Sequence, residues 1–365
     1  MPTPDFNSVI IEEIELPYDM EKSFLKLTFS DPMLKDYSLI VILDSTTCSA
    51  GNRIFTVIAR YPRYVHAEAL RHRVFSRNAS SSRARSVKST LKEVMENPII
   101  PLFTVNQKGM GGRFADDEVR EKQIAAWLRA RDRAVASVLE LLVGPELFDN
   151  YGSGFEDTSA VAAAWEEILD DYYENGYDSA GDPKEGYLST HKQQFNRIIE
   201  PYTPFEEVIT STYWDNFLSL RDHEDAQPEI RAIAVLIKAA LEASSPQERT
   251  YHLPFIPANE IPSDQADWET VLKPLFLRSS AEAAQISYND KSSAEKSTAT
   301  AALGARLFTS RHLSPFEHPA IDSKFYFDEL AVRTDTPLTT AENELISNFD
   351  SSWVQLRPIL AGITK

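Results

Sequence analysis

Residues 70–86 read "LRHRVFSRNASSSRARS", with five arginines, one histidine, a run of serines and no acidic residue. The chain around them is acidic, since its 365 residues carry a formal net charge of −18. Arginine guanidinium groups bind phosphate oxygens in a bidentate manner, and serine hydroxyls add hydrogen-bond donors. The segment therefore indicates a focused site for a small polyanion. A solvated surface is the alternative interpretation of any arginine-rich segment.

The composition excludes several classes of protein. Hydrophobic residues make up 42% of the chain and charged residues 25%, which is typical of a globular protein. No run of 18 apolar residues is present, and the N-terminal residues do not follow the pattern of a secretory signal. The single cysteine, Cys48, fits a reducing compartment, and the acidic balance disfavours a nucleic-acid surface. We expect a cytoplasmic protein with no nucleic-acid or membrane partner.

The segments on either side of residues 70–86 show strand and helix patterns. Residues 37–45 and 53–62 are rich in β-branched residues and predict strands. Residues 63–75, just past a proline, predict a helix that leads into a loop at 76–84. The cationic segment is thus expected to start on a helix and to continue into a loop.

Longer helices are predicted further along the chain. Helical spacing predicts a helix over 118–144, ended by Gly144 and Pro145. A second helix is expected over 225–244 and a third, followed by a turn, over 297–320. The remaining segments predict an acidic surface loop at 169–190, a proline-rich linker at 244–264, and a short helix or strand at 280–290.

The segment "RHLSPFEH", residues 311–318, contains His312, Glu317 and His318. Pro315 would break a helix that places them on one face, and no HExxH or paired-cysteine motif exists, so we predict no metal site. A turn that presents its side chains to a ligand is the favoured interpretation. Nucleophilic catalysis is poorly supported, because no GxSxG, GxGxxG or P-loop motif occurs.

The cationic segment contains Arg71-His72-Arg73, seven further residues and then Ser81. This pattern resembles the signature of the flavin-dependent thymidylate synthase (ThyX) family. Three other segments resemble motifs of the family: "RHLSPFEH", "NFLSLRDHEDAQPEIR" at 216–231 and "NRIIEP" at 196–201. In ordinary members the SPFEH turn precedes the RHR motif, whereas here it follows. The chain therefore resembles a long, phage-type member with circularly permuted motif order.

The resemblance implies an α+β fold, with a ThyX-like mixed or antiparallel sheet flanked by helices, circularly permuted and with helical insertions. It predicts one catalytic domain over 1–365, built from four segments. These are a strand-helix segment with the RHR motif at 36–110, a helical insertion with an acidic loop at 111–190, a second nucleotide- and flavin-binding helical segment at 191–250, and the SPFEH-containing segment at 270–365.

The resemblance also implies a reaction. Members of the family methylate dUMP to dTMP with FAD, NADPH and 5,10-methylenetetrahydrofolate. The cofactors supply the chemistry, so no protein nucleophile is needed. The family's sites form between subunits of a homotetramer, so we expect a homo-oligomer with dUMP and folate as its small-molecule partners. It would lie in the host cytoplasm if the chain is phage-encoded.

Residue roles follow from the matching motif positions. Arg221 would stabilise negative charge that develops on the uracil ring. The resemblance gives catalytic roles to Arg221, Ser81 and His312, substrate contacts to Glu68, Arg71, Ser81, Arg83, Arg197 and Arg221, and cofactor contacts to Arg71, His72, Arg73, Asn78, Asn216, Ser287, His312, Ser314 and Glu317.

Several positions depart from the family pattern. Glu68 replaces the usual glutamine, and residues 210–212 read Thr-Ser-Thr where a flavin-binding N-x-R is usual. Ala79, Ala84, Glu282 and Gln285 also replace characteristic residues. Two alternatives therefore stay open: a flavin-dependent C5 modification of another pyrimidine nucleotide, by hydroxymethylation or on dCMP or UMP, and a non-catalytic nucleotide-binding or scaffold protein.

Overall fold

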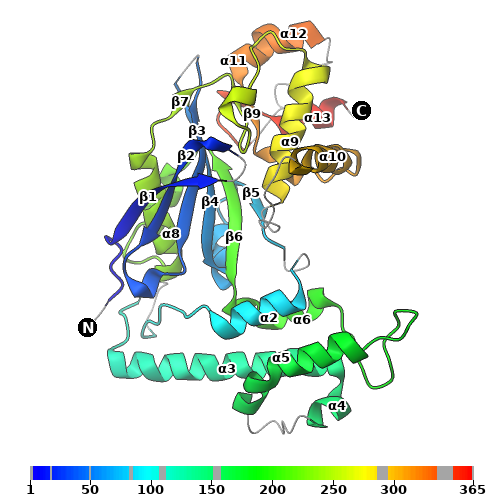
Figure 1. Ribbon diagram of the computed structural model, residues 1–365. Helices are drawn as coiled ribbons and strands as arrows, with labels where there is room; N and C mark the ends of the chain where they lie inside the picture. Colours follow the sequence, from blue (N-terminus) through cyan, green and yellow to red (C-terminus); the bar gives the residue numbers. More distant parts are fainter. Residues whose placement is uncertain are drawn as a thin grey trace. The chain divides into compact units, whose positions relative to one another are not determined.

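A computed structural model describes residues 3–16, 19–48, 51–81, 85–106, 112–150, 158–285, 295–334 and 348–363. The chain divides into two compact units, both built from segments distant in sequence (Figure 1). The first unit comprises Met1–Pro4, Pro62–His66 and Ser81–Phe205, and the second Asp5–Tyr61, Ala67–Ser80 and Glu206–Lys365. One catalytic domain over 1–365 stays a prediction.

The first unit is helical and centres on α3 (Asp117–Val143) (Figure 1). The Asp116 side chain caps this helix by accepting a hydrogen bond from the Val119 amide at 3.0 Å. Gly144 ends it with a φ of +80°, a conformation that favours glycine, so the helix predicted over 118–144 is confirmed. The other helices are η2 (Arg63–Val65), α2 (Val87–Glu96), α4 (Pro145–Asn150), α5 (Thr158–Asn175), α6 (Lys192–Ile199) and η3 (Glu200–Tyr202).

The core of the first unit lies where α5 and α6 pack against α3. Trp165, Ile168, Leu169 and Tyr172 of α5 are buried there at helical spacing. The loop predicted over 169–190 is therefore wrong for its first part, because an apolar stripe continues α5 to Asn175.

The second unit contains a mixed sheet with the strand order β1-β2-β3-β4-β6-β5, to which β7 adds by pairing with β3. The pairs β1–β2, β2–β3, β3–β4 and β5–β6 are antiparallel, and β3–β7 is parallel. A smaller antiparallel sheet has the order β10-β9-β8. The strands are β1 (Val9–Leu16), β2 (Asp19–Phe29), β3 (Ser38–Thr46), β4 (Arg53–Pro62), β5 (Ser76–Ala79), β6 (Pro204–Ser211), β7 (Gln247–Glu248), β8 (Tyr251–His252), β9 (Ala320–Asp322) and β10 (Trp353–Gln355).

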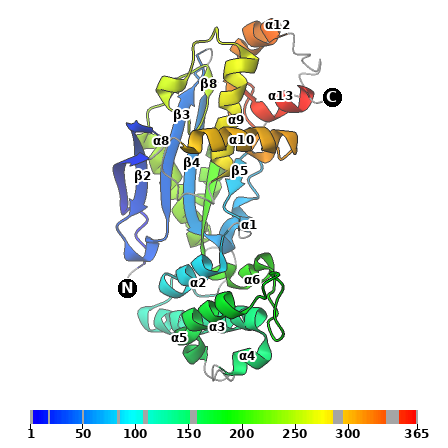
Figure 2. The ribbon, with the colours of Figure 1, turned by 45° about the vertical axis from the view of Figure 1, so that its right-hand side comes forward.

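Helices flank these sheets, so the predicted α+β class with a mixed sheet is confirmed. The helix α8 (Pro228–Ala243) packs on β2 and β3 and buries Ile230, Ile233 and Ile237, so the helix expected over 225–244 is confirmed. The helices α9 (Lys273–Ala284) and α10 (Glu295–Thr309) pack on each other (Figure 2). The other helical segments are η1 (Pro32–Leu34), α1 (His66–Ala69), α7 (Asp215–Arg221), η4 (Ala258–Glu260), η5 (Trp268–Leu272), η7 (Ser314–Glu317), α11 (Ser323–Phe325), η8 (Tyr326–Leu330), α12 (Ala331–Thr334) and α13 (Leu356–Ile363).

Three sequence predictions are corrected by the structure. The helix predicted over 63–75 ends at Ala69, and the loop predicted over 76–84 contains strand β5. The ladder with β6, in which Ser76 faces Thr210, accounts for this strand, since tertiary pairing overrides local preference. The predicted linker at 244–264 holds two strands, and its buried Tyr251 and Leu253 belong to the core.

Candidate functional site

Four of the predicted site residues meet in the second unit, on α1, at the turn after it and on α7. Arg221 is only 6% exposed, and its Nε donates a hydrogen bond to Nε2 of His72 at 3.1 Å. A terminal nitrogen of Arg221 lies 3.5 Å from Oε2 of Glu68. A terminal nitrogen of Arg71 lies 3.5 Å from the same oxygen. We call Glu68, Arg71, His72 and Arg221 the arginine cluster.

His72 is the neutral member of the arginine cluster. Burial lowers the pKa of its imidazole to about 4, and the positive charges of Arg221 and Arg77 act in the same direction. Its ring packs nearly perpendicular to that of Phe217, with 4.8 Å between ring centroids. Because Nε2 accepts from Arg221, the neutral ring holds its proton on Nδ1. His72 thus fixes the orientation of the Arg221 guanidinium without adding charge.

Arg77 has a structural partner rather than a free guanidinium. It lies 2.5 Å from Oε2 of Glu207 on β6 and donates to the Ala69 carbonyl at 2.8 Å. The Tyr61 hydroxyl donates to the same carboxylate oxygen at 2.7 Å. Glu207 is fully buried, and burial raises the pKa of its carboxyl while Arg77 and Tyr61 oppose that rise. The pair ties the chain after α1 to the central sheet.

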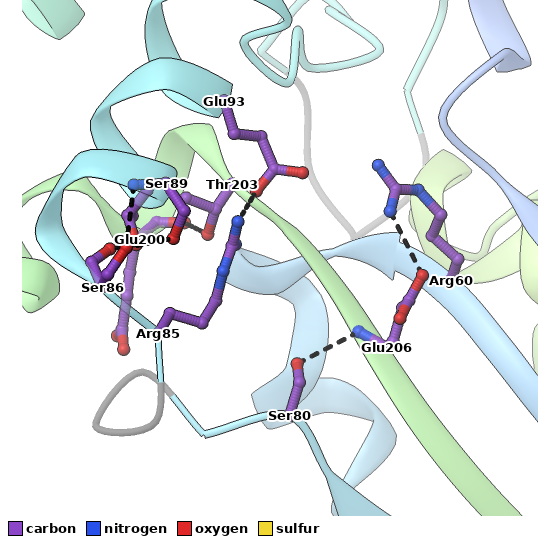
Figure 3. Close-up of polar contacts among 10 residues, drawn as sticks. Arg60, Ser80, Arg85, Ser86, Ser89, Glu93, Glu200, Thr203 and Glu206 are labelled. Carbon is purple, nitrogen blue, oxygen red and sulfur yellow. Dashed lines mark hydrogen bonds and ion pairs between the residues drawn. The ribbon is translucent and has the colours of Figure 1, made fainter. Parts of the chain in front are cut away.

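Arg85, in the first unit, also has an acidic partner, because it forms a close ion pair with Glu93 of α2 (Figure 3). The Ser86 hydroxyl caps this helix by accepting from the Ser89 amide at 3.1 Å. Acids outside residues 70–86 thus compensate Arg71, Arg77 and Arg85. The sequence argument that this segment lacks balancing acids fails in three dimensions. Arg73 is exposed, and Arg83 lies outside the described residues.

Ser80, the residue before Ser81, extends the pairing of β5 with β6 in the second unit (Figure 3). Its amide donates to the Glu206 carbonyl at 2.9 Å, and its hydroxyl accepts from the Glu206 amide at 3.4 Å. The Glu206 side chain pairs with Arg60 of β4 at 3.3 Å. These contacts fix the strand up to the last residue before the predicted phosphate-binding serine.

The SPFEH turn meets the RHR segment within the second unit. The turn η7 packs against β5, although the two lie far apart in sequence. Nε2 of Gln355 donates to the Ser76 hydroxyl at 2.9 Å and to the Glu317 carbonyl at 2.7 Å. The Glu317 carboxylate forms an ion pair with Arg357. This contact between the two segments is what the permuted motif order requires.

The other predicted residues are more scattered. Asn78 is half-buried on β5, and Asn216 is exposed on α7. His312 and Ser314 are exposed at the SPFEH turn. Three residues complete the set: Ser81 and Arg197 lie in the first unit, and Ser287 lies outside the described residues.

A cavity of about 590 Å³ lies between α7 and α8. None of the predicted site residues that the structure describes lines it. Its polar lining is largely paired, because Arg53 pairs with Asp44 at 2.7 Å and Lys238 with Asp222 at 2.9 Å. The described residues that line it are Arg53, Thr212, Trp214, Asp215, Leu218, Ser219, Asp222, Lys238, Leu241 and Glu242.

Metal-binding clusters and membrane-spanning helices are both absent from the part of the chain that the structure describes. That part holds no group of three or more His, Cys, Asp or Glu residues arranged to bind a metal ion. It also holds no helix with both the length and the apolar character needed to cross a membrane.

Comparisons with known proteins add a family match. A sequence model described as "thymidylate synthase complementing protein" (Thy1) matches residues 53–247, more than half of the chain. No curated protein matches. Among solved structures, the chain is similar to the UMP/dUMP methylase PolB from Streptomyces cacaoi bound with 5-Br UMP. The identity is 15% and the TM-score 0.33, and the match covers 56% of this chain and 88% of that chain.

Proposed function

The chain belongs to the thymidylate synthase complementing protein family, and we propose that it methylates dUMP at C5 to give dTMP. The observation that carries the proposal is the arginine cluster, in which neutral His72 orients Arg221 beside Glu68. A guanidinium held in this way stabilises negative charge on a pyrimidine carbonyl without reorganising during the reaction.

Members of this family generally depend on flavin, and the RHR turn fits the phosphates of FAD. The Arg71 side chain is 67% exposed, and Arg73 is also exposed, so both guanidinium groups can reach phosphate oxygens. FAD, when bound, supplies the hydride that completes the methyl group, with NADPH as the reductant and 5,10-methylenetetrahydrofolate as the carbon donor. In this proposal Asn78, Asn216, Ser287, His312, Ser314 and Glu317 complete the cofactor site.

The protein's own residues bind and orient the substrate. We propose that Ser81, Arg83 and Arg197 bind the phosphate of dUMP, while Arg221 faces the uracil carbonyl. The proposal also assigns Glu68 and Arg71 to the substrate site. It also includes a homo-oligomer, a tetramer in the family, in which a second protomer supplies part of the site.

A second candidate substrate is favoured by Glu68. Its Oε2 is buried, and its contacts to Arg71 and Arg221 are ion pairs at 3.5 Å. A carboxylate only accepts hydrogen bonds, and it is the group that proteins use to accept from the 4-amino group of cytosine. A related C5 modification of dCMP is therefore the second candidate activity. Measuring turnover of dUMP, dCMP and UMP under identical conditions distinguishes the candidate substrates.

Flavin binding tests the cofactor part of the proposal. The purified protein should bind FAD at about one per chain, seen in its visible absorbance. Replacing Arg73 with alanine should weaken FAD binding about tenfold or more, because one charge-assisted contact to phosphate is lost. The exposed Arg129 of α3 gives the matched control, and Arg129→Ala should leave the affinity unchanged. A colourless protein that does not take up added FAD would contradict the proposal.

A further inference from the structure

Five fully buried polar side chains form a continuous hydrogen-bonded row through the second unit, which we call the buried polar chain. The Ser45 hydroxyl lies 2.9 Å from Nδ1 of His252, and Nε2 of His252 lies 2.8 Å from the Thr56 hydroxyl. The hydroxyls of Thr56 and Thr210 are 2.7 Å apart. Thr210 in turn lies 2.8 Å from Nδ1 of His318. The row runs from β3 and β8 through β4 and β6 to the last residue of the SPFEH turn.

The number of protons in the buried polar chain couples the tautomers of its two histidines. Each threonine hydroxyl has one proton, and neither hydroxyl has a hydrogen-bond partner outside the row among the described residues. Thr56 and Thr210 therefore each donate one bond of the row and accept the other. A neutral imidazole likewise donates at one nitrogen and accepts at the other. All bonds must therefore point the same way along the row. His252 and His318 consequently share one tautomer, either both protonated on Nδ1 or both on Nε2.

Both imidazoles are neutral at pH 7. Burial lowers the pKa of His318 to about 3. Burial also lowers the pKa of His252 well below its usual value, and the charge of Arg249 acts in the same direction. The coupling of the tautomers therefore applies under ordinary conditions.

The outer nitrogen of His318 decides between the two arrangements. Nε2 of His318 is buried and has no hydrogen-bond partner among the described residues. A buried N–H without an acceptor is rarer in proteins than an unsatisfied acceptor. The arrangement with both protons on Nδ1 leaves only a lone pair at this position. His318 then donates to Thr210, and His252 donates to Ser45.

We propose that Thr210 and His318 are positioning residues that hold the SPFEH turn against the sheet, and that the buried polar chain locks both histidines in the Nδ1–H tautomer. Thr210 belongs to residues 210–212, which read Thr-Ser-Thr, and its burial directs its hydroxyl to His318 rather than to a cofactor. The SPFEH turn carries His312 and Ser314, which the proposed function assigns to the cofactor site, so the positioning role rests on the proposed function. The tautomer assignment does not rest on it.

The test uses the full chain with histidine labelled with ¹⁵N, and the ring nitrogens are observed by NMR at pH 7. The signals are assigned with His252→Gln and His318→Gln variants. The signals assigned to His252 and His318 should both show a neutral ring protonated on Nδ1. Signals that show His252 and His318 in different tautomers, both in the Nε2–H form, or charged at pH 7 would overturn the assignment.

The Thr210→Val variant interrupts the buried polar chain, while Thr210→Ser keeps the hydroxyl. The valine variant should change the His318 signals and weaken FAD binding about tenfold, and the serine variant should retain both wild-type properties. Thr90 of α2 gives a control, because it is a buried threonine that is not part of the chain. Thr90→Val should leave the histidine signals unchanged. If Thr210→Val does not fold, Thr56→Val interrupts the same row.

The two readouts separate the inference from the proposed function. Histidine signals as expected in a protein that does not bind FAD would support the tautomer assignment and contradict the proposed cofactor. Unchanged His318 signals in a folded Thr210→Val variant would overturn the inference whether or not FAD binds.

Discussion

Replacing Arg221 with lysine should lower kcat/KM for dUMP about a hundred- to a thousand-fold. Lysine keeps the positive charge but lacks the planar fork that donates to His72 through Nε while a terminal nitrogen faces Glu68. A single ammonium group does not maintain both contacts and also reach a pyrimidine carbonyl. The loss should appear mainly in kcat, because charge on the base develops during the reaction.

Arg231 of α8 provides the control for this substitution. Its guanidinium lies 4.7 Å from the ring centroid of Phe6 and belongs to no predicted site. The Arg231→Lys variant should retain turnover within about threefold. A folded Arg221→Lys enzyme with wild-type kcat would show that Arg221 does not act on the substrate.

Replacing Arg77 with methionine should lower the free energy of unfolding by about 3–5 kcal/mol. The substitution leaves the Glu207 carboxylate fully buried without its cationic partner, while the Tyr61 hydroxyl still donates to it. Urea unfolding of the full chain measures the effect. The expected loss in the free energy of unfolding is large because the Glu207 carboxylate is buried, and not only because the two charges lie close together.

The neighbouring residue on β6 gives a matched control. Glu206 pairs with Arg60 at 3.3 Å, but both side chains are about one-third exposed. The Arg60→Met variant should therefore lose less than about 1 kcal/mol. The double variant Arg77→Met with Glu207→Gln should recover much of the stability, because it removes the uncompensated charge. Equal losses for Arg60→Met and Arg77→Met would contradict this account of the pair.

Local sequence patterns predicted the helices and strands whose residue spacing and end signals lie within the element itself. The strand at 53–62 and the helix at 118–144 have regular spacing and clear ends, and both are confirmed. Strand β5 and the buried residues of 244–264 could not be predicted in this way. Their structure depends on partners in β6 and β9, which no local pattern of polarity reveals.

In the candidate site, too, contacts between residues far apart in sequence could not be predicted from local patterns. The family resemblance selected Glu68, His72 and Arg221, which meet in the second unit. The charge argument for residues 70–86 was weaker, because Arg77 pairs with Glu207, 130 residues further along the chain. An ion pair of this kind is invisible when acids are counted within one segment.

The buried polar chain was not predicted at all. Its members lie on several strands and one turn, and none of them is unusual in its local sequence. In "RHLSPFEH", His318 lies beside His312 and Glu317 as a candidate metal ligand, and nothing in that segment indicates a partner on β6. Only the folded second unit brings His318 to Thr210.

The most direct test of the proposed activity is tritium release from dUMP labelled at C5. The purified protein is supplied with FAD, NADPH and 5,10-methylenetetrahydrofolate, and methylation at C5 displaces the labelled hydrogen. We expect release that requires all three compounds, with dTMP as the product. A folded protein that binds FAD but releases no tritium from dUMP under these conditions would contradict the proposal that it is a thymidylate synthase.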